Sequence, residues 1–277
     1  MYHRRILLLS TFLIFCIAAG AQTPFNRLYV FGDSYSDIGE GYLDGNGPTA
    51  VAYLAQDLGF VLLPADKSTN PNQSLDFAIS GAQTGSGQGK HMETALLGFG
   101  MLNQVADFEQ RLNHRQIQFN ASKTLFFIAG GLNDHNLPAE TTVQNLQAEV
   151  RTLYKLGARH FEIALLPTAI PAFAEVGLRL NPVISLIPAQ LRSELPSAQI
   201  SLSKWGPFFD EVMHSPQQYG IIDTKEACAG REIFHQDSKP CANPDAHFYY
   251  HAGHPSTAVH KIVGQKLADE ILNSPLK

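Results

Sequence analysis

The sequence carries little charge. Only 16% of its 277 residues are Asp, Glu, Lys or Arg, the net charge is -5, and no long run of one sign occurs. Proteins that bind nucleic acid or anionic membranes through electrostatics usually carry a clustered basic surface. We therefore expect no nucleic-acid partner and no basic membrane-binding patch.

Long apolar runs are missing too, except at the N-terminus. Residues 6–17 form an apolar stretch that follows Arg4 and Arg5 and is short for a membrane span. Ala19-Gly20-Ala21 then fits the small-x-small pattern of a signal-peptide cleavage site. We interpret residues 1–21 as a signal peptide, so we expect a secreted or periplasmic protein without stable membrane insertion. An uncleaved anchor is the alternative.

Cysteine is scarce. Cys16 lies in the predicted signal peptide, which leaves Cys228 and Cys241 for the mature chain. Two cysteines thirteen positions apart in an exported protein are expected to pair. Such a bridge stabilises a fold by roughly 2–4 kcal/mol. Two free thiols are the alternative.

Patterns typical of metal or nucleotide sites are incomplete. Four histidines crowd one segment, but no cysteine or carboxylate motif completes a zinc site with them; they are His247, His251, His254 and His260. The glycine-rich run 85–90 fails the phosphate-loop pattern, because Thr84 replaces its first glycine and His91 its Ser or Thr. We expect neither a metal nor another cofactor.

Short apolar runs alternate with helical periodicity along the chain. The runs at 28–31, 125–129, 161–166 and 200–202 predict strands, and the patterns at 48–58, 102–112, 143–153 and 259–271 predict helices. This alternation favours an α/β fold with a mostly parallel sheet covered on both faces. No repeat or low-complexity linker divides the chain, so we expect one domain over residues 22–277.

Polar residues follow the predicted strands, where ligands bind in parallel sheets. Ser34 follows the first strand and Asn133 the second. Ser34 is either a nucleophile or a turn serine, and Asn133 either donates to an oxyanion or caps a turn. Between them, Gly81 offers a backbone N–H that a substrate oxygen can approach closely. His254-Pro-Ser256 precedes the last helix, and proline at a first helical position would hold this histidine in a defined place.

These four segments together resemble the SGNH hydrolases, also called the GDSL lipase/esterase family. They match it in content and in order: Gly-Asp-Ser, a glycine in the second block, Gly-Leu-Asn-Asp, and His-Pro-Ser near the end. The resemblance implies a three-layer α/β/α, flavodoxin-like fold. It implies Ser34 as nucleophile, His254 as general base, and an oxyanion hole from the N–H groups of Ser34 and Gly81 and the amide of Asn133. Asn46-Gly-Pro48 before a helix is similar to the lipase and acyltransferase branch.

The resemblance also implies an activity. We expect a monomeric, secreted serine esterase or lipase that hydrolyses an ester or lipid substrate through an acyl-enzyme on Ser34. An acyltransferase needs only an alcohol as the second acceptor, and stays open. A non-catalytic binding protein on the same scaffold is a third interpretation.

One position departs from the family. An aspartate usually stands three residues before the catalytic histidine, and here that residue is His251. We expect His254 Nδ1 to be oriented by a backbone carbonyl or a displaced carboxylate, with Asp245 the first candidate, or by neutral His251. His251→Asp would restore the family's usual charge and is expected to match or raise activity. The apolar run 171–188 either walls an acyl pocket or belongs to the core.

Overall fold

A six-stranded parallel sheet forms the centre of the protein, whose residues 23–273 are described by a computed structural model. The strand order is β2-β3-β1-β6-β7-β8, and every adjacent pair is parallel. The strands are β1 (Arg27–Gly32), β2 (Leu62–Pro64), β3 (Ser74–Asp76), β6 (Thr124–Ala129), β7 (His160–Ala164) and β8 (Gln199–Ser203). The middle strands β1 and β6 are buried almost throughout, because their apolar side chains face helices on both sides.

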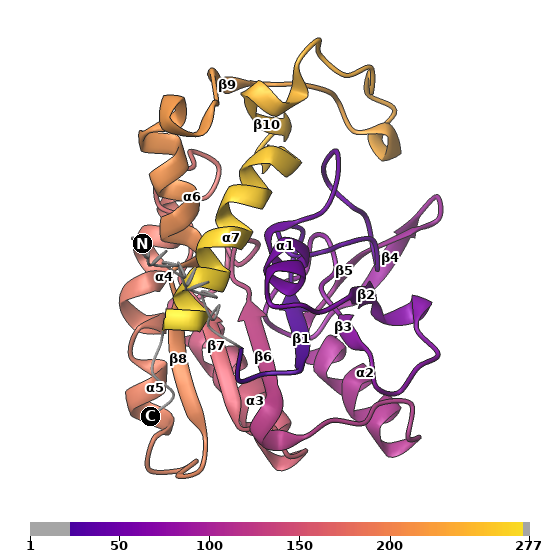
Figure 1. The fold of residues 1–277 in the computed structure, drawn as a ribbon, viewed down its shortest axis with the longest axis vertical. Helices are drawn as coiled ribbons and strands as arrows, with labels where there is room; N and C mark the ends of the chain where they lie inside the picture. Colours follow the sequence, from indigo (N-terminus) through magenta and orange to yellow (C-terminus); the bar gives the residue numbers. More distant parts are fainter. Residues whose placement is uncertain (1–22, 274–277) are drawn as a thin grey trace, which may run out of the picture.

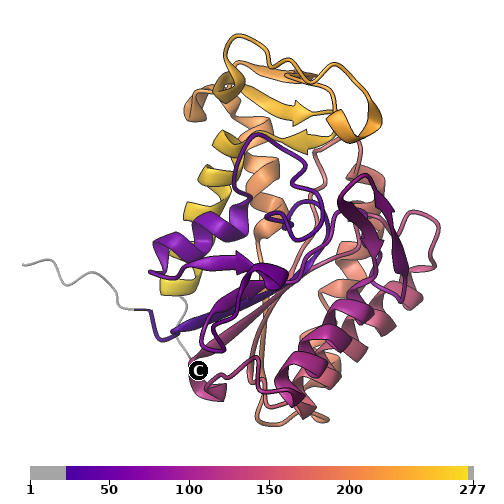
Figure 2. The same ribbon diagram turned by 90° about the vertical axis from the view of Figure 1, so that its right-hand side faces the viewer.

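Helices cover both faces of this sheet and complete a three-layer α/β/α fold (Figures 1 and 2). One layer consists of α1 (Ala50–Asp57), α6 (Trp205–His214) and α7 (Thr257–Asn273), which contact one another through α7. The other contains α2 (Met101–Asn113), α3 (Ala139–Lys155), α4 (Ala174–Ile184) and α5 (Ile187–Leu191). The parallel sheet and the layered architecture confirm the predicted fold class.

Aromatic side chains fill the core beneath the functional edge of the sheet. Tyr29 and Phe126 of the central strands lie edge-on to Phe108 of α2, with ring centroids 5.0 and 5.7 Å from it. Phe31 stacks on Phe77 at 5.2 Å. Burying one such side chain contributes about 1.5–3 kcal/mol to folding, so the strand ends that follow are anchored firmly.

Two smaller sheets lie outside the central one, the first at the top of Figure 1 and the second at its right. A second sheet has the order β11-β10-β9, and a hairpin joins two further strands. These strands are β9 (Asp223–Ala227), β10 (His247–His251), β11 (His254–Pro255), β4 (Gln88–Met92) and β5 (Ala95–Phe99). Five 3-10 turns are also present among the described residues: η1 (Ala65–Lys67), η2 (Ala121–Lys123), η3 (Pro216–Tyr219), η4 (Glu232–Phe234) and η5 (Pro244–Ala246).

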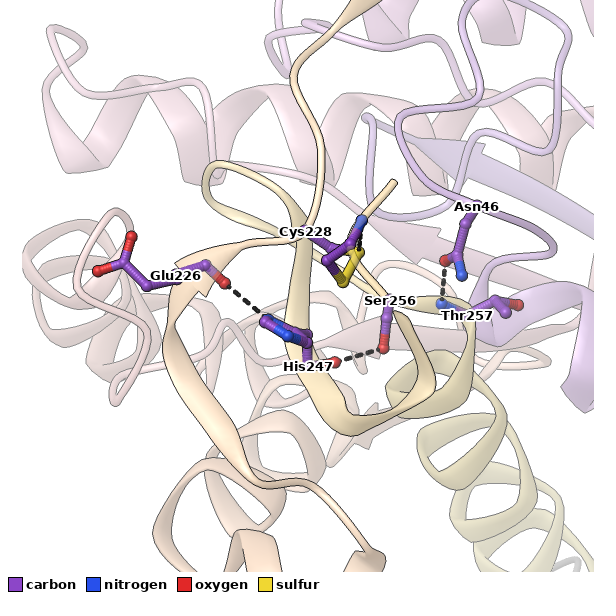
Figure 3. Close-up of a disulfide and its surroundings, with 7 residues drawn as sticks. Asn46, Glu226, Cys228, His247, Ser256 and Thr257 are labelled. Carbon is purple, nitrogen blue, oxygen red and sulfur yellow. Dashed lines mark hydrogen bonds between the residues drawn. A yellow bond between two sulfur atoms is a disulfide. The ribbon is translucent and has the colours of Figure 1, made fainter. Parts of the chain in front are cut away.

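The start of the last helix differs from the expected one. Pro255 belongs to β11, and α7 begins only at Thr257, so proline does not occupy the first helical position. Asn46 Oδ1 instead accepts the Thr257 N–H at 2.8 Å (Figure 3), and Thr257 Oγ1 donates to Pro48 O at 2.9 Å. A Cβ on Gly47 would lie 2.9 Å from Thr257 Oγ1, so glycine permits this close approach. The segment 46–48, which is far from α7 in sequence, therefore stabilises the start of this helix by direct contacts.

Cys228 and Cys241 form the predicted disulfide, which excludes two free thiols. The bridge closes the loop 228–241 directly after β9 (Figure 3). The predicted signal peptide, residues 1–21, lies outside the described residues. Within residues 23–273, no helix has both the length and the apolar character needed to cross a bilayer.

Candidate active site

Ser34 and His254 meet at the carboxyl edge of the central sheet. Ser34 follows β1 directly after Gly32-Asp33, and its Oγ lies 2.7 Å from His254 Nε2 in β11. A Cβ on Gly32 would lie 2.6 Å from Ala129 O of the neighbouring strand, so only glycine fits where the chain leaves β1. Folding thus joins a hydroxyl and an imidazole that are 220 positions apart in the sequence.

The predicted oxyanion donors line the same pocket. Ser34, Gly81, Asn133 and His254 all border a cavity of about 220 Å³. Gly81 has φ +78°, a left-handed conformation that glycine adopts without strain. Asn133 Nδ2 donates one hydrogen to Ala82 O at 2.9 Å, which orients the amide, and its second hydrogen is available to a ligand. The structure thus brings all four predicted residues to one place.

Buried carboxylates hold the loops that carry these donors. Asp134, next to Asn133, accepts hydrogen bonds from the Thr84 N–H at 3.1 Å, the Thr84 hydroxyl at 2.5 Å and the Thr142 hydroxyl at 2.7 Å. Asp37 accepts the Ser80 N–H at 2.8 Å, immediately before Gly81. Burial raises the pKa of Asp37, although backbone N–H groups oppose the increase. Both carboxylates therefore position the loops without contacting the Ser34–His254 pair in the described part of the chain.

Comparison with known proteins identifies the family. The model of the GDSL-like lipase/acylhydrolase family matches residues 28–267. The chain belongs to this family. It is 22% identical to the GDSL esterase/lipase EXL6 of Arabidopsis thaliana over 98% of each chain, and 22% identical to GDSL esterase/lipase 7 of the same plant over 88% of each chain. A solved structure from Veillonella parvula, a member of the lipolytic protein G-D-S-L family, aligns with a TM-score of 0.50 at 12% identity, covering 90% of this chain and 99% of that one. The protein is a carboxylic ester hydrolase of the GDSL family.

This GDSL enzyme has a carboxylate at its active site that sequence reasoning missed. Asp44 is 8% exposed and lies in the loop between β1 and α1. Its Oδ2 is 3.3 Å from His254 Nε2, and its Oδ1 is 2.7 Å from His251 Nδ1. Arg231 Nε is 2.9 and 2.8 Å from the two carboxylate oxygens. No sequence signal pointed to Asp44, because 210 residues separate it from the histidine that it approaches.

The side chains expected to orient His254 are placed elsewhere. Asp245 is exposed in η5, and among the described residues no hydrogen bond or ion pair joins it to His254. His251 pairs with His254 across β10 and β11, but its Nδ1 binds Asp44 rather than His254. These two side-chain expectations are corrected. The remaining expectation was a backbone carbonyl near this ring nitrogen. Ala252 O does lie 3.3 Å from His254 Nδ1.

Arg231 also contacts this ring nitrogen. Its Nη2 lies 2.6 Å from His254 Nδ1 and 2.7 Å from Ala252 O. A guanidinium only donates, so Nδ1 accepts in this arrangement and the ring hydrogen is on Nε2, facing Ser34 and Asp44. A base that takes the Ser34 proton needs the opposite tautomer. Nη2 must therefore withdraw from Nδ1, after which the Nδ1–H can donate to Ala252 O.

The neighbouring charges shift the ionisation of both His254 and Asp44. Burial lowers the pKa of His254 to about 4, an effect that Asp44 opposes and Arg231 reinforces. Burial alone would raise the pKa of Asp44, but the hydrogen bond from His251 and the positive charges of His254 and Arg231 lower it below its ordinary value. At neutral pH the pocket therefore holds a neutral His254 beside an ionised Asp44 and a cationic Arg231.

The other histidines of this region have separate partners. His247 Nδ1 is 3.3 Å from Glu226 O (Figure 3), and His260 Nδ1 accepts the Ala50 N–H at 3.1 Å. Burial lowers the pKa of His260 to about 3. Across residues 23–273, no group of three or more His, Cys, Asp or Glu side chains is placed to hold a metal ion.

Apolar side chains complete the wall of the active-site pocket. They come from the β1–α1 loop, from β5 and from the disulfide-closed loop, and are Tyr42, Leu97, Ile233 and Phe234. The run 171–188 forms α4 and the start of α5, and no residue of it lines this pocket. Its apolar residues Leu180, Ile184 and Ile187 are fully buried in the core, whereas Leu178 and Leu186 are exposed. The ring centroid of Phe173, at the start of the run, lies 6.5 Å from that of His254.

Proposed function

We propose that this GDSL-family hydrolase is a secreted serine esterase in which Ser34 is the nucleophile and His254 the general base. The observation that carries the proposal is the 2.7 Å contact between Ser34 Oγ and His254 Nε2 at the edge of a pocket. A serine hydroxyl is a weak nucleophile unless an adjacent base takes its proton during attack. A neutral His254 is available for this step at neutral pH, because its pKa is about 4.

The proposed reaction has two halves. Ser34 Oγ bonds to the ester carbonyl carbon as its proton passes to His254 Nε2, and the carbonyl oxygen becomes an oxyanion. The N–H groups of Ser34 and Gly81 and the amide of Asn133 stabilise that charge. The carbon–oxygen bond to the alcohol then breaks, and the alcohol leaves with the proton from His254. A water molecule attacks the acyl-enzyme by the same route and releases the acid.

Pocket size supports a preference for short acyl groups. The cavity of about 220 Å³ is smaller than the roughly 300–1,000 Å³ typical of sites for drug-sized ligands. Its wall includes Leu97, Ile233 and Phe234, which suit an acyl chain rather than a charged group. Export is supported by the N-terminal pattern of residues 1–21 and by the disulfide, which persists in oxidising compartments.

The test is Ser34→Ala in the purified mature protein. We expect loss of hydrolysis across a series of p-nitrophenyl esters and loss of covalent labelling by a fluorophosphonate, because no oxygen remains to form the acyl-enzyme. In the unmodified enzyme, the shorter esters of the series should have the higher kcat/KM. The matched control is Ser193→Ala, an exposed serine after α5, which should retain activity and labelling. A folded Ser34→Ala protein with unchanged turnover would refute the assignment.

A further inference from the structure

The groups around His254 have no part in the steps above, yet they form a connected cluster. Asp44 contacts both His251 and Arg231, and Arg231 contacts the far side of the His254 ring. We infer that Asp44 supplies the negative charge that stabilises protonated His254, replacing the aspartate that the family usually carries at position 251. This inference rests on the proposed roles of Ser34 and His254.

The first step in the argument is the way the fold places Asp44. Asp37 accepts the Gly39 N–H at 2.8 Å and the Tyr42 N–H at 2.9 Å, which folds the loop back on itself before Asp44. Asn46 then binds the start of α7 at Thr257, three residues after His254. The Asp44 loop is thus attached on one side to the Ser34 segment and on the other to the His254 segment.

The second step concerns charge. When His254 takes the Ser34 proton it becomes positive, and Arg231 Nη2 is only 2.6 Å from its Nδ1. Tyr35, whose ring centroid lies 5.4 Å from that of His254, is neutral at pH 7 because burial raises its pKa well above its usual value. His260 is neutral too, because burial lowers its pKa to about 3. Asp44 Oδ2, 3.3 Å from Nε2, is therefore the group that offsets the positive charge of Arg231.

The third step separates two tasks that one aspartate usually performs. Asp44 approaches Nε2, so it cannot fix the hydrogen on Nδ1, a task for which Ala252 O is placed at 3.3 Å. Orientation thus comes from the backbone and charge from Asp44. His251, at the family's usual acidic position, donates to Asp44 and helps to keep the carboxylate ionised and in place.

The main test is Asp44→Asn, which preserves shape and removes the charge. We expect kcat to fall about 10²-fold with little change in KM, less than the roughly 10⁴-fold loss that follows when the orienting aspartate of a serine protease is replaced, because Ala252 O still selects the tautomer. Asp245→Asn is the matched control. It removes the same charge from an exposed carboxylate that is close to His254 in sequence, and it should leave kcat unchanged. Asp44→Glu should be more active than Asp44→Gln of equal length, which gives a comparison if Asp44→Asn fails to fold.

The pH profile distinguishes charge from structure. For the unmodified enzyme, kcat/KM should fall as the pH drops through the pKa of His254, about 4, since the base must be neutral. Removing a negative neighbour destabilises the imidazolium, so Asp44→Asn should move this acid limb to lower pH. Removing a positive neighbour does the reverse, so Arg231→Gln should move it to higher pH. Each shift of the acid limb should be roughly 1 pH unit or more, as expected for charged groups that lie this close to the His254 ring.

A charge exchange provides a rescue. His251 Nδ1 now lies 2.7 Å from Asp44 Oδ1, so His251→Asp would place a second carboxylate against Asp44. This substitution alone should therefore lower activity, contrary to the expectation from sequence. Adding Asp44→Asn removes the repulsion and leaves one carboxylate, so the double variant should regain at least tenfold in kcat over His251→Asp.

If Asp44→Asn keeps full kcat and an unmoved acid limb while Ser34→Ala is inactive, this inference is wrong and the proposed function stands. If Ser34→Ala is active, the proposed function itself is wrong.

Discussion

At the scale of single residues, a backbone contact orients Asn133 for its proposed role in catalysis. Its amide gives one hydrogen to Ala82 O, which fixes the plane of the group before substrate arrives. A donor fixed in this way stabilises a developing oxyanion without reorganising during the reaction. In the proposed oxyanion hole, Asn133 therefore acts on the transition state more than on the bound substrate.

Asn133→Ala should lower kcat by about 10²–10³, the usual cost of losing one oxyanion donor, with KM nearly unchanged. Steady-state kinetics on a p-nitrophenyl ester gives both constants. Asn243→Ala, an exposed asparagine in the loop before η5, is a control that should keep both. A change confined to KM would show that Asn133 only binds the ground state or supports its turn.

The same scale shows what sequence can and cannot reveal about a site. The meeting of Ser34, Gly81, Asn133 and His254 in one site was predictable because each lies in a short segment, and the four segments occur in the same order as in the family that the sequence resembles. Asp44 was not, because a carboxylate that acts on a histidine 210 positions away needs no particular neighbours in sequence. Asp245 was favoured on proximity along the chain, but the turn of η5 leaves it exposed.

At the scale of elements, the long and strongly periodic segments were predicted well. Strands β1, β6, β7 and β8 and helices α1, α2, α3 and α7 all occur where apolar patterns placed them. The short strands β9, β10 and β11 showed no such pattern: β9 is largely exposed and carries polar residues, β10 is mostly buried but mixes histidine with aromatic residues, and β11 has only two residues. Tertiary contacts rather than local preference determine these strands, and two of them hold His251 and His254.

The start of α7 gives a prediction at this scale. Asn46→Ala removes the acceptor for the Thr257 N–H, an interaction like a helix N-cap but made from a distant loop. The expected loss is about 1 kcal/mol, or roughly 2–4 °C in melting temperature for a protein of this size. Thermal denaturation followed by circular dichroism measures it, with Asn243→Ala again as the reference. An unchanged melting temperature would show that the N–H is equally well satisfied by water.

At the scale of the whole molecule, the disulfide connects stability with the site. The loop that it closes carries Arg231, Ile233 and Phe234, three of the residues that line the pocket. Replacing both cysteines by serine frees this loop in the folded and unfolded chain alike. We expect a loss of roughly 2–4 kcal/mol in the free energy of unfolding, measured by urea denaturation, together with a raised KM. Equal stability and equal KM in the double variant would mean that loop contacts alone maintain the pocket.

With the proposed roles of Ser34 and His254, their distance in sequence also determines when the enzyme becomes active. A growing polypeptide presents Ser34 early, but the imidazole that activates it is added 220 residues later. Every shorter fragment, whether from interrupted synthesis or from proteolysis before His254, carries a serine with no base to activate it. The cell that makes this hydrolase therefore holds a chain without hydrolytic activity until its final strand and helix have folded into place.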